Sequence, residues 1–127
     1  ISFKVRIVGL DAPESRQFYG KVAKYQLQQL IDQKSVTLKP LKRSLDQYNR
    51  VLAQVYLNGE DIALKMIQGG YAFYYRPSCR DFPEDKNRYN YDPRIYVNAE
   101  LYAKKSKLNI WQSNKVELPC EFRKRNK

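Results

Sequence analysis

The sequence contains no histidine among its 127 residues. This absence excludes His-based catalytic triads, zinc sites with His ligands and His general bases. Hydrolytic chemistry in this chain would therefore depend on carboxylates, Lys, Arg, Tyr or a metal held by oxygen ligands.

Cysteine and long apolar runs are also scarce. The two cysteines, Cys79 and Cys120, have no CxxC spacing, which argues against a zinc site. They could pair in an oxidising compartment or remain free thiols, and the sequence leaves both states open. No apolar run approaches the roughly 18 residues of a transmembrane helix, so no segment is predicted to span a membrane.

Positive charge is abundant, with 24 Lys and Arg against 13 Asp and Glu and a net charge of +11. Such an excess favours a polyanionic partner, and nucleic acid is preferred here over an anionic membrane surface. A basic chain kept soluble by its charge is the alternative. The length suits a single domain. Because the chain begins at Ile1 and not at Met, we expect a processed or trimmed form with a segment upstream.

The segment VRIVGLDAPE, residues 5–14, combines an apolar strand with an acidic turn. Arg6 lies inside the strand and needs a partner there. Asp11 and Glu14 flank the dipeptide Ala12-Pro13, and the proline stiffens the turn. Two carboxylates so spaced can converge on a hard cation or on a water molecule to be activated. The alternative is a surface Arg followed by an acidic turn that caps the next helix.

Periodicity and turn residues predict three strands and three helices along the chain. The strands are expected at residues 1–10, 35–41 and 50–57, the last closed by an Asn58-Gly59 turn. The helices are expected from an N-cap at Ser15 to about residue 33, at 61–68 before Gly69-Gly70, and at 95–108. Their predicted inward side chains are Phe18, Val22, Leu27, Leu30 and Ile31 in the first helix, Ile62, Met66 and Ile67 in the second, and Ala99, Tyr102 and Ala103 in the third. Residues 71–75 read as extended, 76–94 as a long loop, and 121–127 as a basic tail that frays.

Four of these pieces form a set in a fixed order: VRIVGLDAPE at 5–14, DQYNR at 46–50, IQGGYA at 67–72 and KSKLNIW at 105–111. The set resembles the staphylococcal (micrococcal, thermonuclease) nuclease family over nearly the whole chain. The resemblance implies an α+β fold with a mainly β core, an OB-like five-stranded barrel with three helices, in a single domain over residues 1–127. It also implies that the first two strands, and a second calcium-binding aspartate within them, precede Ile1, so that the chain is N-terminally truncated.

The resemblance assigns roles to individual residues. Asp11 would ligate calcium, the backbone carbonyl of Ala12 would add a second ligand, and Glu14 would orient or deprotonate the attacking water, with contact to the metal through water. Arg6 and Arg50 would hold phosphate oxygens. The implied reaction is calcium-dependent hydrolysis of DNA, and RNA in addition, without sequence preference and with 3′-phosphate ends.

Two tyrosines, Tyr48 and Tyr75, are candidates for stacking on bases, against the alternative of ordinary half-buried tyrosines. Asp46 is interpreted as a turn or supporting residue. The sequence leaves the oligomeric state open, with a monomer favoured. The resemblance favours a protein that is secreted or attached to the cell envelope.

The competing hypothesis is a non-catalytic OB-type nucleic-acid-binding module, like the nuclease-like repeats of scaffold proteins. Such repeats usually lack the catalytic carboxylates and arginines. Here Arg6, Asp11, Glu14 and Arg50 are all present, which favours the enzyme. A module that uses only its charge would leave their spacing unexplained.

Overall fold

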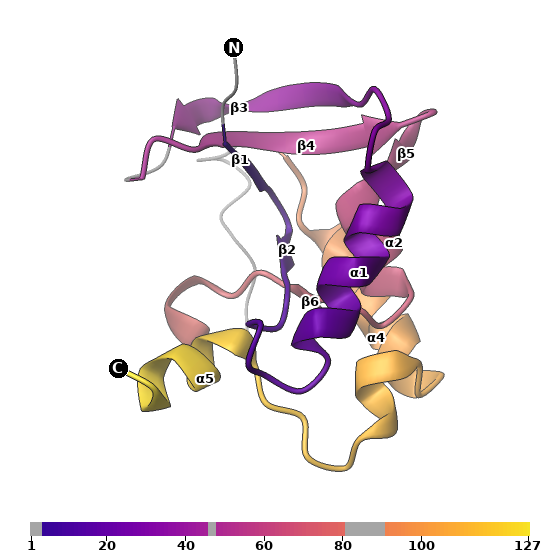
Figure 1. Cartoon of the computed structure of the whole chain (residues 1–127), viewed down its shortest axis with the longest axis vertical. Coiled ribbons are helices and arrows are strands. Elements are labelled where there is room, and N and C mark those ends of the chain that lie inside the picture. The colour runs from indigo at the N-terminus through magenta and orange to yellow at the C-terminus, as the bar shows by residue number, and fades with distance from the viewer. Residues whose placement is uncertain (1–3, 46–47, 81–90) are drawn as a thin grey trace.

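The computed structural model describes residues 4–45, 48–80 and 91–127, and it confirms the α+β class (Figure 1). Within these ranges the elements are, in order, β1 (Val5–Ile7), β2 (Leu10–Asp11), α1 (Gly20–Ile31), β3 (Thr37–Leu45), β4 (Val51–Leu57), β5 (Glu60–Asp61), α2 (Ile62–Gln68), β6 (Phe73–Tyr74), the 3₁₀ helix η1 (Pro77–Cys79), α4 (Arg94–Lys105), the 3₁₀ helix η2 (Asn109–Gln112) and α5 (Pro119–Arg125).

The strands of the described residues form two sheets. In the first, β4 lies between β1, which runs parallel to it, and β3, which runs antiparallel, while β5 pairs with the far end of β4. The second sheet consists of β2 and β6, paired antiparallel. The five-stranded barrel stays a prediction.

The predicted first strand is interrupted between β1 and β2 at Gly9, whose φ is +91°. A Cβ at this position would lie 2.5 Å from the ring of Tyr96, so the residue must be glycine on two grounds. The break directs the chain from the first sheet into the second (Figure 1). As a result Arg6 lies in one sheet and Asp11 in the other.

β3 and β4 pair antiparallel; β4 matches the strand predicted at 50–57, whereas β3 continues to Leu45, beyond the predicted end at residue 41. Pro40 pairs with Ala53 from β3, which lies at one end of the described strand order, as expected for a strand that contains proline. Asn58 and Gly59, which join β4 to β5, have φ values of 52° and 79°. These positive values match the predicted hairpin turn.

Helix α2 is the most buried helix of the described residues, and its predicted inward residues Ile62, Met66 and Ile67 are each at most 1% exposed. Asp61 caps it by accepting a hydrogen bond from the Leu64 backbone N–H at 3.1 Å. Helix α4 covers it with Ala99 and Ala103 facing inward, as predicted. Tyr102 is 56% exposed, contrary to prediction. The inward face is defined by positions 96, 99, 100 and 103, and position 102 falls about 110° away from its centre.

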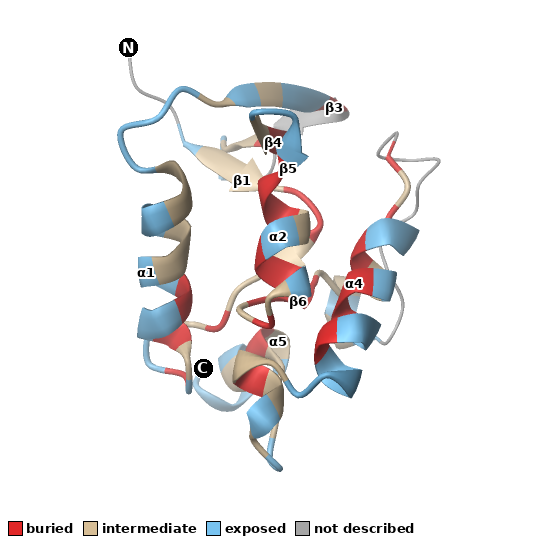
Figure 2. Cartoon of the chain, turned by 90° about the vertical axis from the view of Figure 1, so that its right-hand side faces the viewer, coloured by how far each residue is buried: buried red, intermediate tan, exposed pale blue. Residues whose placement is uncertain are grey.

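Helix α1 begins at Gly20 and not at the predicted N-cap Ser15, because residues 15–19 form turns. Gly20 and Ala23 are buried, and Leu27, Leu30 and Ile31 are half-buried beside them. The predicted inward residues Phe18 and Val22 are 63% and 45% exposed. Phe18 precedes the helix, and Val22 lies on the face opposite Gly20. Figure 2 shows this outer face of α1 in the colour of exposed residues.

The C-terminal segment corrects the predicted fraying tail. Most of residues 121–127 belong to α5, and Cys120 in its first turn forms a disulfide with Cys79 of η1. Of the predicted loop 76–94, residues 77–79 are 3₁₀-helical and Arg94 already belongs to α4, while 81–90 lie outside the described residues.

Candidate active site

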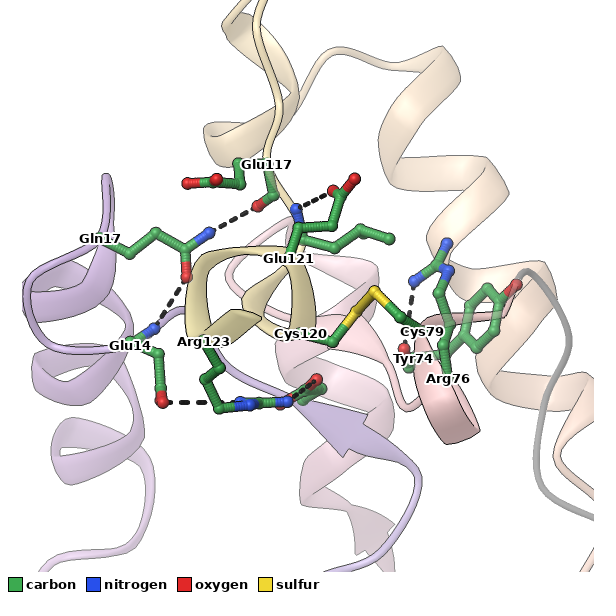
Figure 3. Close-up of polar contacts among 11 residues, drawn as sticks. Glu14, Gln17, Tyr74, Arg76, Cys79, Glu117, Cys120, Glu121 and Arg123 are labelled. Carbon is green, nitrogen blue, oxygen red and sulfur yellow. Dashed lines mark hydrogen bonds and ion pairs between the residues drawn. A yellow bond between two sulfur atoms is a disulfide. The ribbon is translucent and has the colours of Figure 1, made fainter. Parts of the chain in front are cut away.

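Two predicted site residues, Asp11 and Glu14, come together at the end of β2. The Asp11 side chain is 15% exposed and the Glu14 side chain 40% exposed. Glu14 sits in a turn fixed by Gln17, whose side-chain oxygen accepts from the Glu14 N–H at 3.0 Å. The Gln17 side-chain nitrogen donates in turn to the carbonyl oxygen of Glu117 at 2.5 Å. The buried Gln17 therefore links the Glu14 turn to the C-terminal segment (Figure 3).

The start of α1 packs against this same turn. A Cβ on Gly20 would lie 1.9 Å from the carbonyl oxygen of Glu14. No side chain fits in that space, so glycine is required for α1 to begin beside the Glu14 turn.

An arginine that the sequence reasoning missed binds both carboxylates. Arg123 of α5 donates from Nη2 to Asp11 Oδ2 at 3.1 Å and from Nη1 to Asp11 Oδ1 at 3.4 Å. Its Nη1 also lies 3.6 Å from Glu14 Oε1 (Figure 3). Burial lowers the pKa of the Arg123 guanidinium, but the hydrogen bond and charge of Asp11, together with Glu14, raise the pKa overall, so the group stays charged. No sequence pattern near Arg123 indicates this contact, because 112 residues separate it from Asp11.

The predicted phosphate-binding residue Arg6 has an aromatic partner. Its guanidinium carbon lies 4.3 Å from the centre of the Tyr75 ring. The N–H of Tyr75 donates to the carbonyl of Gly9 at 2.9 Å, which continues the pairing of β2 with β6. Within the described residues Arg6 makes no ion pair with Asp11 or Glu14. The expectation that this arginine needs a partner is met by Tyr75.

The second predicted arginine, Arg50, also lies near a predicted tyrosine. Its guanidinium carbon is 5.3 Å from the centre of the Tyr48 ring, and Tyr48 is 68% exposed. Arg6 is the register partner of Leu52, and Arg50 precedes Leu52 by two residues. Because side chains alternate along a strand, this register indicates that Arg6 and Arg50 share one face of the sheet. Asp46 lies outside the described residues.

A buried ion pair fixes Tyr74 and Arg76, the two residues that flank Tyr75. Glu100 of α4, 4% exposed, accepts from Arg76 Nη2 at 2.6 Å and from the Tyr74 N–H at 3.0 Å. Arg76 also donates to the Tyr74 carbonyl at 3.2 Å and stacks on the Tyr74 ring at 3.8 Å. Sequence reasoning placed Arg76 in a loop, because a loop arginine and a helix glutamate 24 residues later carry no shared pattern.

The site offers oxygen ligands for a metal ion. Asp11 and Glu14 present carboxylates, and the backbone carbonyl of Ala12 lies between them in sequence. The guanidinium of Arg123 shows that both carboxylates can bind one cation. Two carboxylates with water and a carbonyl fit a hard ion such as calcium. No group of three or more His, Cys, Asp or Glu residues suited to a metal occurs in the described part of the chain.

The chain was compared with known proteins to place this arrangement of Arg6, the acidic turn at Asp11 and Glu14, and Arg50 in a family. The model of the family described as staphylococcal nuclease homologue matches residues 4–113. The chain belongs to the staphylococcal nuclease family.

Relatives in the staphylococcal nuclease family carry nuclease names. An uncharacterized endonuclease of Haemophilus influenzae is 33% identical over 126 residues, which cover 99% of this chain and 63% of that protein. The probable endonuclease LCL3 of Saccharomyces cerevisiae is 35% identical over 133 residues, covering 95% of this chain and 45% of the relative. The staphylococcal-like nuclease CAN1 of Arabidopsis thaliana is 31% identical over 123 residues, covering 96% and 33%.

This member of the staphylococcal nuclease family thus spans between 33% and 63% of the length of these relatives. Among the residues that the structure describes, no helix has the length and apolar character needed to cross a bilayer.

Proposed function

We propose that the chain is a calcium-dependent nuclease that hydrolyses phosphodiester bonds of DNA, and of RNA in addition, without sequence preference. The observation that carries the proposal is the convergence of Asp11 and Glu14 on a single cationic group. Membership of the staphylococcal nuclease family and the nuclease names of its relatives support the reaction class.

The site residues divide the chemistry among them. Asp11 and the carbonyl of Ala12 would hold the ion, and bound calcium would supply polarisation of the scissile phosphate. Glu14, with a 40% exposed carboxylate, would accept the proton of the attacking water. The new bond joins the water oxygen to phosphorus, and the bond to the 5′-oxygen breaks. The products are a 3′-phosphate and a 5′-hydroxyl that takes its proton from solvent.

The arginines would bind the phosphate. Arg6 and Arg50 offer planar paired N–H donors, whose hydrogen bonds strengthen as negative charge builds in the transition state. The Arg6 guanidinium lies over the Tyr75 ring, and this contact limits the freedom of the side chain before phosphate binds.

Substrate choice follows from which parts of the nucleic acid these residues reach. The proposed contacts address phosphate, and phosphate contacts carry no sequence information. The net charge of +11 adds attraction for any polyanion. The exposed Tyr48 ring can stack on a base, which favours single strands.

The decisive experiment is digestion of single-stranded DNA in calcium and in a chelator, with the parent chain, Glu14→Gln and Glu60→Gln. Glu60 is the matched control, because it is an exposed glutamate paired with Lys65 in another part of the molecule. We expect calcium-dependent cleavage by the parent and by Glu60→Gln, and a large loss in Glu14→Gln.

Other outcomes have definite meanings. DNA binding without cleavage would overturn the nuclease in favour of the non-catalytic binding module. Equal cleavage in calcium and in chelator would overturn the calcium requirement alone.

A further inference from the structure

Arg123 occupies the position where the proposed function needs a cation. Its guanidinium contacts both oxygens of Asp11 and one oxygen of Glu14. Asp11 is the side chain proposed to ligate calcium, and Glu14 is proposed to contact the ion through water. A guanidinium and a divalent ion a few ångströms apart repel each other, so the contact with Asp11 would weaken when the metal binds.

Two connections keep α5 beside the site when that contact weakens. The Cys79–Cys120 disulfide joins the first turn of α5 to η1, which follows Tyr75 and Arg76. The Gln17 side-chain nitrogen donates to the carbonyl oxygen of Glu117, just before α5, at 2.5 Å. Neither connection uses a carboxylate oxygen of Asp11 or Glu14, so Arg123 would stay close to the metal and to whatever the metal binds.

The guanidinium also has donors to spare. Its contacts with Asp11 and Glu14 use at most three of the five N–H groups of an arginine. The side chain is 42% exposed, so the remaining donors can reach a ligand from solvent. Planar paired N–H groups suit phosphate as well as they suit carboxylate.

We propose that Arg123 is a third phosphate-binding arginine, which holds Asp11 and Glu14 in the metal-free protein and transfers its hydrogen bonds to a substrate phosphate when calcium binds. This inference rests on the proposed function for the identity of the metal and substrate. It adds to Arg6 and Arg50 a residue from the opposite end of the chain.

The test compares Arg123→Ala and Arg123→Lys with Lys124→Ala. Lys124 is exposed and lies on the same helix, so its variant removes the same charge from the same place without touching the carboxylates. Calcium affinity is measured by calorimetry without nucleic acid. We expect Arg123→Ala to bind calcium about tenfold more tightly than the parent, because a competing cation is gone, and Lys124→Ala to match the parent.

Cleavage of a single-stranded oligonucleotide in saturating calcium gives the second readout. We expect Arg123→Ala to lower kcat/KM by about tenfold or more, and Arg123→Lys to restore part of it. Tighter calcium binding with slower cleavage is the signature, because a variant that merely damaged the fold would lose both. Thermal unfolding of all variants confirms folding, and Arg123→Lys stands in if the alanine variant does not fold.

Three results would overturn the proposal. The first is faster cleavage by Arg123→Ala than by the parent, which would make Arg123 only an inhibitor. The others are weaker calcium binding by Arg123→Ala than by the parent, and equal effects of Arg123→Ala and Lys124→Ala. If the parent itself does not cleave, the proposed nuclease function fails separately. In that case the intact oligonucleotide serves as a ligand. The proposal for Arg123 then requires that, in calcium, Arg123→Ala binds this oligonucleotide more weakly than Lys124→Ala does.

Discussion

The guanidinium of Arg6 lies over the ring of Tyr75, 4.3 Å from its centre. One of these residues belongs to β1, and the other directly follows β6. Arg50 and Tyr48 form a second, looser pair at 5.3 Å. Arg6 and Arg50 thus each have a tyrosine beside them, which can hold the planar guanidinium before substrate binds.

Replacing Arg6 or Arg50 by lysine should abolish most activity. Lysine keeps the charge but loses the planar paired donors and the stacking surface. We expect kcat/KM on single-stranded DNA to fall on the order of a hundredfold or more in each variant, as when an oxyanion donor is removed. Arg94→Lys, at the exposed start of α4, is the control. Parent-like rates in either site variant would show that its arginine is not a phosphate ligand.

Glu14→Gln should separate binding from catalysis. The amide keeps the shape of the side chain but cannot accept the proton of water. We expect DNA affinity, measured by fluorescence anisotropy, to be retained while single-turnover cleavage drops sharply. Parallel loss of affinity and cleavage would show instead that Glu14 is structural.

Glu100→Gln should destabilise the protein and disturb Tyr75. It removes the negative charge that Glu100 places against Arg76, whose side chain is 10% exposed. Breaking a buried pair from one side costs roughly 3–5 kcal/mol. Glu60→Gln breaks the exposed pair with Lys65, for which we expect roughly 0–1 kcal/mol. Urea unfolding of both variants measures the difference, and similar small values would mean that the Arg76–Glu100 pair contributes little.

Gly20→Ala should impair stability and cleavage together. The new methyl group meets the Glu14 carbonyl oxygen, so either the turn or α1 must move. We expect a loss of roughly 1–3 kcal/mol, as in other overpacked sites, and slower cleavage. Gly59→Ala is the contrast: its methyl group has open space, but φ is +79°, so it should lower stability and leave cleavage unchanged. A Gly20→Ala variant with parent activity would show that the Glu14 turn tolerates displacement.

Removal of the disulfide by Cys79→Ser with Cys120→Ser should affect both stability and the site. The cross-link spans 41 residues, for which loop-closure entropy predicts about 4 kcal/mol. Because α5 carries Arg123, we also expect slower cleavage under conditions where the variant remains folded. Chemical unfolding and kcat/KM, measured beside the reduced parent, test the two effects. Unchanged cleavage in a folded variant would show that α5 holds its position without the disulfide.

The local elements were predictable where one short segment determines them. The Asn58-Gly59 turn, the inward face of α2 and the acidic turn at Asp11 each depend on neighbouring residues. The start of α1 was mispredicted because it depends on packing between Gly20 and a backbone carbonyl six residues earlier, which no periodicity shows.

Contacts between distant segments escaped prediction for the same reason. Arg123 and Asp11 are separated by 112 residues, and no residue next to either of them in the sequence predicts their contact. The cysteines could be counted, but only the fold brings Cys79 and Cys120 together. The predicted site therefore contained the residues of the motifs and lacked the one contributed by α5.

The disulfide also closes a covalent ring of the chain between Cys79 and Cys120. A protease that cuts one bond inside this ring would leave two fragments joined through sulfur, with the mass of the whole chain plus one water. The carboxylates precede the ring and Arg123 follows it, so both would remain in the same nicked molecule. Such a cut would pass unnoticed on a non-reducing gel and appear only after a reductant is added.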